Sequence, residues 1–106
     1  MLLVTSETVA NHKIVKTLGL VRGNTVRARH VGKDIMAGFR NIVGGEIHEY
    51  TKLMAESREH TIDRMVADAE RLGANAIITT RFTTSVIVGG AAELLATGTA
   101  VLIEAE

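Results

Sequence analysis

The chain has 106 residues, 46% of them hydrophobic and 23% charged, and its 12 basic and 12 acidic side chains give a formal net charge of +0. This balance is typical of one globular domain, here 1–106, and argues against general binding to nucleic acid or anionic membranes, which usually requires a basic excess. The absence of cysteine excludes disulfides and thiolate metal sites of the zinc-finger type.

The N-terminal stretch "MLLVTSETVA" has no basic segment and no apolar run long enough for export. No part of the chain approaches the roughly 18 consecutive apolar residues of a membrane-spanning helix. We therefore expect a soluble, cytoplasmic protein.

The first part of the chain has the pattern of β-strands. A short strand is predicted at 2–4. The apolar stretch 12–21, the turn-forming sequence "RGN" at 22–24 and the alternating stretch 25–31 together predict a hairpin.

The hydrophobic period then changes to that of helices. Apolar residues at helical spacing predict a short helix over 32–43. Gly44 and Gly45 are predicted to end it and to form a joint with a long helix over about 46–72. Gly73 stands where a glycine commonly ends a helix.

One face of the long helix carries an apolar stripe, which Ser57, Arg58 and Thr61 interrupt near its middle. The stripe consists of Ile47, Tyr50, Met54, Ile62, Met65, Ala69 and Leu72. At 1.5 Å per residue the helix is roughly 40 Å long. A compact chain of this size has a radius of gyration near 13 Å, so we expect the helix to span or overhang its own domain.

The C-terminal part returns to strands. They are predicted at 75–82, 83–88 and 91–106, with the glycine pair 89–90 as the turn between the last two. The last strand is apolar on both faces until Glu104, and two helices on one side of a sheet cover only one face. We therefore expect a partner chain, another copy, to cover the rest.

Four stretches of the chain carry a family resemblance. They are "AGFRNIVGGEIHEY" (37–50), "YTKLMAESREHTIDRM" (50–65), "AERLGANAIITTRF" (69–82) and "ATGTAVLI" (96–103). In this order they resemble the YbjQ-like family of small bacterial proteins, often labelled "putative heavy-metal-binding domain".

The resemblance implies an α+β fold with a β-α-β-β core related to dodecin subunits. A mainly antiparallel sheet would be packed by one long and one short helix in two layers. The resemblance also implies a ring-shaped homo-oligomer, a pentamer. It implies no particular ligand set, because no function is established for the family.

Three side chains on the long helix have the spacing of metal ligands. Glu56, His60 and Asp63 stand at i, i+4 and i+7 on one helix face, and an imidazole with carboxylates can bind a divalent ion. The alternative, which we favour, is a solvated face. Other charged residues on that side are Glu49, Lys52, Glu59 and Glu70.

Anion binding has two candidate features. Arg27 and Arg29 share one strand face and could bind a phosphate or a carboxylate, although salt bridges to a neighbouring subunit are the favoured interpretation. The sequence "IVGG" occurs at 42–45 and again at 87–90, but neither copy fits a P-loop or a dinucleotide-binding motif. We interpret both glycine pairs as structural joints.

Arg58 and Thr61 break the apolar stripe, so we expect them to face an interior or a subunit seam. The other candidates for a seam or structural position are Gly44, Gly45, Glu46 and Tyr50. No serine stands in a nucleophile-elbow pattern, and no catalytic residue is predicted.

Three hypotheses for function follow. The first is a non-enzymatic, self-assembling protein with an ion or small-ligand site at its subunit junctions. The second is a protein that binds a divalent or heavy metal through Glu56, His60 and Asp63. The third is an enzyme that handles anions or nucleotides on the Arg27/Arg29 face. We favour the first hypothesis over the other two, and therefore expect that the protein is not an enzyme.

Overall fold

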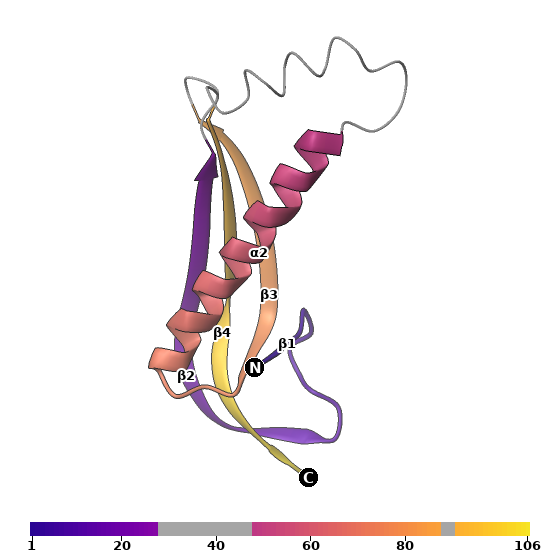
Figure 1. Cartoon of the computed structure of the whole chain (residues 1–106). Helices are drawn as coiled ribbons and strands as arrows, with labels where there is room; N and C mark the ends of the chain where they lie inside the picture. Colours follow the sequence, from indigo (N-terminus) through magenta and orange to yellow (C-terminus); the bar gives the residue numbers. More distant parts are fainter. Residues whose placement is uncertain (28–47, 88–90) are drawn as a thin grey trace.

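The computed structural model describes residues 1–27, 48–87 and 91–106. These residues form strands β1 (Leu2–Leu3), β2 (His12–Arg27), β3 (Ala76–Ile87) and β4 (Ala91–Ala105), and helix α2 (His48–Arg71). The chain is thus an α+β protein in which α2 crosses one face of a sheet (Figure 1). The predicted helix over 32–43, the glycine joint after it and the turn at 89–90 lie outside the described residues.

The sheet has the strand order β1-β3-β4-β2. β4 pairs antiparallel with β2 on one side and with β3 on the other, while the short β1 pairs parallel with β3. The prediction of a mainly antiparallel sheet is therefore confirmed, with one parallel pair at its edge. β4 comes last in the chain but lies between the two long strands in space.

The predicted hairpin over 12–31 is wrong, because β2 continues through the predicted turn at 22–24. Gly23 is not a turn residue. A Cβ atom at this position would collide with the carbonyl oxygen of Thr61 and the backbone nitrogen of Met65. Glycine is therefore needed here so that the backbone of α2 can lie directly on β2.

β3 is also longer than predicted, because the two strands expected at 75–82 and 83–88 form one. The register with β4 shifts between Ile78 and Arg81, and Thr79 in this interval has a φ of 53°. An extra residue in one strand of an antiparallel pair is a β-bulge, which bends a strand without ending it.

The C-terminus of α2 is capped as predicted. Gly73 has a φ of 83°, its N–H donates to the carbonyl of Glu70, and the N–H of Ala74 donates to the carbonyl of Ala69. These two bonds make a Schellman motif, in which a residue with positive φ satisfies the last carbonyls of the helix.

The buried face of α2 differs from the predicted stripe. It consists of Ser57, Thr61, Met65 and Ala69, all with 0% exposure. Met65 and Ala69 are thus confirmed in the core, whereas Leu72 is 45% exposed. Ser57 and Thr61 were expected to interrupt an apolar face, but they continue it at a spacing of four residues.

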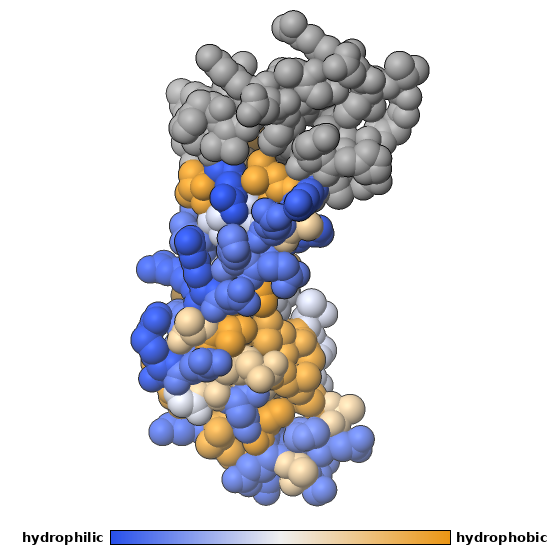
Figure 2. All heavy atoms as spheres, in the orientation of Figure 1, coloured by the Kyte–Doolittle hydropathy of each residue, from blue (hydrophilic) through white to orange (hydrophobic). Residues whose placement is uncertain are grey.

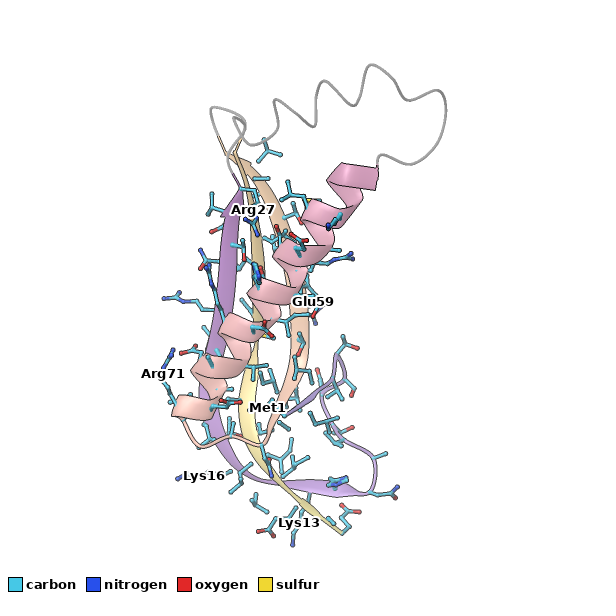
Figure 3. All side chains as sticks on the ribbon, in the orientation of Figure 1. Met1, Lys13, Lys16, Arg27, Glu59 and Arg71 are labelled. Atoms are coloured by element: carbon cyan, nitrogen blue, oxygen red, sulfur yellow. The ribbon has the colours of Figure 1, made fainter. Side chains whose placement is uncertain are left out.

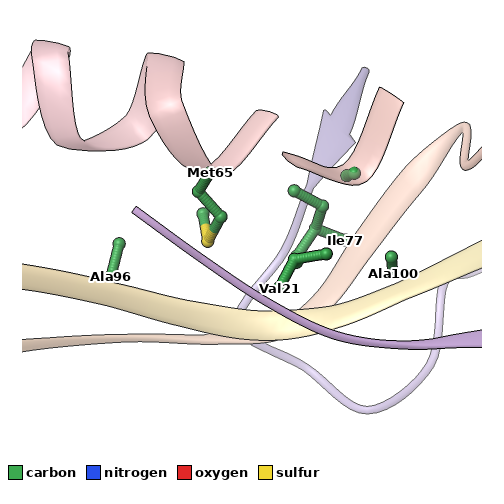
Figure 4. Close-up of a cluster of buried hydrophobic side chains, with 6 residues drawn as sticks. Val21, Met65, Ile77, Ala96 and Ala100 are labelled. Carbon is green, nitrogen blue, oxygen red and sulfur yellow. The ribbon is translucent and has the colours of Figure 1, made fainter. Parts of the chain in front are cut away.

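Two hydrophobic clusters hold the sheet, one on each face. The cluster under α2 is shown in Figure 4 and consists of Val21, Met65, Ala69, Ile77, Ala96 and Ala100. The second consists of Ala76, Ile78, Val101 and Ile103, with Val4 and Val9 of the N-terminal segment packed against it. The N-terminal segment therefore covers part of the face for which we had expected a partner chain.

The chain is extended for its size. The radius of gyration of the Cα atoms is 17.3 Å, against about 13 Å for a compact chain of similar length. In the helix-side view, hydrophilic residues follow α2 and hydrophobic residues gather beside it (Figure 2). No helix in the described ranges is long and apolar enough to cross a membrane.

Candidate functional site

Polar side chains meet between β2 and α2, near Gly23, where the helix backbone contacts the strand. We call this group the β2–α2 seam; it consists of Thr25, Arg27, Ser57, His60 and Thr61. Arg27 lies near the end of β2, beside α2 (Figure 3). Two of the predicted site residues, Arg27 and His60, are thereby brought together by the fold.

The hydroxyls of the seam form a connected chain of hydrogen bonds. Thr61 Oγ1 donates to the carbonyl of Ser57 at 2.7 Å, and Thr25 Oγ1 lies 2.7 Å from Thr61 Oγ1 and 3.4 Å from the same carbonyl. Ser57 Oγ donates to the carbonyl of Leu53 at 2.9 Å. Buried hydroxyls are costly unless they are bonded, and here each has a partner. The role of these hydroxyls is therefore structural, because their hydrogen bonds fix α2 on β2.

Arg27 joins this chain from the more exposed side. Its Nε donates to Ser57 Oγ at 2.7 Å and its Nη2 lies 3.3 Å from Nδ1 of His60. Because arginine can only donate, Nδ1 of His60 must accept. In the neutral imidazole the proton then resides on Nε2, so neither ring nitrogen offers a free lone pair to a metal.

The predicted metal ligands are placed on the outer side of the helix. Glu56, His60 and Asp63 are all exposed. Across the described parts of the chain, no group of three His, Cys, Asp or Glu side chains is positioned to hold a metal ion. With the imidazole engaged by Arg27, the single chain does not present these three residues as a formed metal site.

The predicted anion site is only partly described. Arg29 lies outside the described residues. Arg27 is half-buried and directed toward Ser57 and His60 of α2, because it occupies the same face of β2 as the buried Thr25. Its guanidinium therefore already has two partners within the chain.

The residues predicted at a subunit interface or a structural joint fall into two groups. Gly44, Gly45 and Glu46 lie outside the described residues, as does the side chain of Tyr50. Arg58 is exposed on α2, so its predicted position in the interior of its own domain is wrong, and a subunit seam stays a prediction.

A second polar group was not predicted from the sequence. Asp68 on α2 accepts from the backbone N–H of Arg22 at 3.2 Å and from the side chain of Arg71 at 2.5 Å. Nearby, Arg64 donates to the carbonyl of Asn24 at 2.5 Å. Arg22 and Asn24 belong to the edge strand β2, so Asp68 and Arg64 together satisfy backbone groups that an edge strand leaves open.

The bonds to Asp68 also set its ionisation. The backbone N–H of Arg22, and then the side chain of Arg71, lower the pKa of Asp68 below its ordinary value, because both stabilise the carboxylate. The spacing of Asp68 and Arg71 at i, i+3 is visible in the sequence. The contact with Arg22, 46 residues away, is not.

Comparison with protein families gives a match over nearly the whole chain. The YbjQ family model, described as "putative heavy-metal-binding", matches residues 1–104.

Curated relatives are similar in sequence and length. A UPF0145 protein of Dehalococcoides mccartyi strain 195 is 58% identical over 104 residues, which are 98% of this chain and 100% of that protein. A UPF0145 protein of Methanosarcina acetivorans is 54% identical over 103 residues, 97% of each chain. Such relatives therefore occur in archaea as well as in bacteria.

Among solved structures, one similar chain is a protein of unknown function from Pediococcus pentosaceus, assigned in its description to the DUF74 family. It aligns with a TM-score of 0.65 and 15% sequence identity, covering 98% of both chains. At this identity the similarity supports the fold alone.

Proposed function

Because the chain belongs to the YbjQ family, whose model is described as "putative heavy-metal-binding", we propose that it is a non-enzymatic binding protein that assembles from copies of itself. The proposed assembly is a ring, a pentamer, with the ion or small-ligand site at the junctions between subunits. The pentamer and the relation to dodecin subunits rest on the family resemblance. The support for self-assembly comes from the two edges of the sheet.

The observation that carries the proposal is the outer edge of β3. β1 pairs with β3 only at Ala76 and Ile77, and Val4 and Ser6 then accept from the N–H groups of Thr80 and Thr79. Beyond this point, no strand in the described ranges pairs with the outer edge of 81–87. An open strand edge is a ready template for pairing with another chain.

The side chains beside this edge are apolar and exposed. Val86 is 87% exposed and Phe82 is 47% exposed. Their register opposite Ala92 and Ala96 places them on the same face of the sheet as α2, yet the helix packs mainly over β2 and β4. Removing such side chains from water is favourable by roughly 25 cal/mol per Å².

The opposite edge of the sheet carries a different apolar group. On β2, Ile14, Val15 and Leu20 are 38%, 42% and 71% exposed. In the described ranges, side chains of α2 bond the outer edge of β2 around Arg22 and Asn24. Two unlike surfaces on opposite edges favour a head-to-tail contact, which closes into a ring if the rotation allows.

Size-exclusion chromatography with light scattering at micromolar concentration tests this proposal. The wild-type chain is expected to elute as a single oligomer. Val86→Lys is expected to lower its mass or shift it toward monomer, because a lysine beside an open edge opposes strand pairing. Ala67→Lys, on the exposed side of α2, adds the same charge and is expected to leave the mass unchanged. A wild-type chain that is a stable monomer contradicts the proposal.

Metal binding is the second candidate function, favoured by the description of the family model. Its ligands would be Glu56, His60 and Asp63. The bond from Arg27 to Nδ1 of His60 opposes it in the single chain. A metal must displace the guanidinium, either to bind Nδ1 itself or to let the ring proton move from Nε2 to Nδ1 so that Nε2 can bind.

Calorimetry with zinc, copper and nickel tests the metal hypothesis. Binding is expected to disappear in His60→Ala and to persist in His12→Ala, which removes a histidine elsewhere. Arg27→Gln is expected to strengthen binding, because it removes a positive charge beside the imidazole. Equal binding by His60→Ala and the wild-type chain would show that these ligands are not used.

A further inference from the structure

We propose that the face of the sheet opposite α2 binds a phosphate group of a small molecule between Arg22 and Arg81, with Thr97 beneath it. The three residues come from three neighbouring strands. Arg22 lies opposite Thr97 in the β2–β4 register, and Arg81 lies opposite Thr97 in the β3–β4 register. They therefore form one row across the sheet.

The alternation of burial fixes the face on which this row lies. Val21 and Gly23, which flank Arg22, are buried under α2. Ala96, next to Thr97, belongs to the core cluster under the helix. Since successive side chains in a strand point to opposite faces, Arg22, Thr97 and Arg81 point away from α2. The N-terminal segment covers the adjoining part of this face, around Ile78 and Val101.

The donors of this row are free to bind a ligand. Arg22 and Arg81 are exposed and Thr97 is half-buried. Within the described ranges, neither guanidinium lies in an ion pair, and the Thr97 hydroxyl makes no hydrogen bond to protein. The backbone of Arg22 is held by Asp68, which fixes the position from which its side chain extends.

The charges around the row favour an anion. The Asp68 carboxylate already accepts from Arg22 N–H and from Arg71. Glu93 is on the same face, four residues from Thr97 along β4, and its carboxylate accepts from the side chain of Asn24, two residues from Arg22 on β2. In the described ranges, two positive charges therefore flank Thr97, and the carboxylates of Asp68 and Glu93 lie beside the row, at β2, rather than between the two arginines.

The number of hydrogen-bond donors in this row indicates which kind of anion it would bind. The two arginines lie on either side of β4, about 10 Å apart at the backbone, so both long side chains can reach an ion above Thr97. Two guanidinium forks and one hydroxyl offer about five donors, more than the roughly four acceptor positions of a carboxylate. The three oxygens of a phosphate can accept all of them. The zero net charge and the three aromatic residues of the chain favour a small phosphate ligand over a nucleic acid.

An NMR titration of the full chain at low ionic strength tests the site, with inorganic phosphate and glycerol phosphate as separate probes. We expect saturable shifts centred on the amide of Thr97 and its cross-strand neighbours. Arg81→Gln is expected to weaken binding about tenfold or more, the size of one lost charged hydrogen bond. Thr97→Val, which keeps the shape of the side chain, is expected to weaken it severalfold.

Arg58→Gln is the matched control, because it removes the same charge from an exposed position on α2. Its affinity for phosphate is expected to equal that of the wild-type chain. Equal weakening in Arg58→Gln and Arg81→Gln would overturn the proposal, since binding would then follow net charge. The absence of shifts with both probes would overturn it as well. Binding of glycerol phosphate but not of inorganic phosphate would support the site and identify a phosphate ester as its ligand.

Discussion

Gly23 is predicted in a turn but lies inside strand β2, where it has a structural role. In the sequence it stands in "RGN", a typical turn signal. In the structure it is the point on β2 at which α2 touches the strand with its backbone, at Thr61 and Met65. The bonds of Thr25 Oγ1 to Thr61 Oγ1 and to the carbonyl of Ser57 depend on this close approach, because both cross the gap between β2 and α2.

Gly23→Ala is expected to destabilise the fold by about 1–3 kcal/mol, the usual cost of an added methyl group in a packed core. The backbone of α2 cannot rotate away as a side chain could, so the helix must shift as a whole. Urea unfolding followed by circular dichroism measures the change. Ser85→Ala, at an exposed strand position, is the control and is expected to change stability by less than about 0.5 kcal/mol. A Gly23→Ala chain as stable as the control would mean that α2 does not lie directly on β2.

At the scale of elements, α2 has two roles toward β2. Its buried face packs on the strand, and its charged side chains Asp68 and Arg64 bond the outward backbone groups of Arg22 and Asn24. A helix that satisfies an edge strand protects it from pairing with other chains. β3 lacks such a helix beyond Arg81 in the described structure.

Asp68→Asn is expected to lower stability at neutral pH, and the difference from the wild-type chain is expected to shrink as the pH falls below 3.8, the ordinary pKa of the carboxyl. The folded pKa of Asp68 lies below its unfolded value, so the ionised carboxylate contributes stability above the unfolded pKa. That contribution is lost as the pH falls through the folded pKa. Urea unfolding of both chains between pH 7 and pH 3 measures the difference. A difference that stays constant over this range would show that the charge of Asp68 does not contribute.

The elements also show how far the sequence predicts this fold. The end of α2 at Gly73 was predictable, because a Schellman motif involves only neighbours in the chain. The identity of the buried face of α2 was not, because Ser57 and Thr61 are buried through hydroxyl bonds to β2 rather than by hydrophobicity. Pairing Arg27 with His60, or Arg22 with Arg81, required the strand register, which no local pattern in this sequence specifies.

At the scale of the whole molecule, the two faces of the sheet are covered unequally. α2 covers one face over β2 and β4, and the N-terminal segment covers the other around Val101 and Ile103. The part of this face that a second copy could cover is therefore smaller than expected. It carries Arg22, Thr97 and Arg81. The larger exposed apolar side chains lie toward the sheet edges, at Leu20 and Val86.

The central position of β4 has a consequence for how the chain reaches its fold. β2 and β3 do not pair with each other, and both have β4 as their long antiparallel partner. The ribosome synthesises β4 after all the other described elements. Until then, α2 has no complete sheet to pack against, and the apolar faces of β2 and β3 remain exposed to water. We therefore expect folding to be slow relative to a helical chain of equal length, since its central contacts join residues far apart in sequence. During synthesis, the nascent chain would need protection from aggregation up to its last strand.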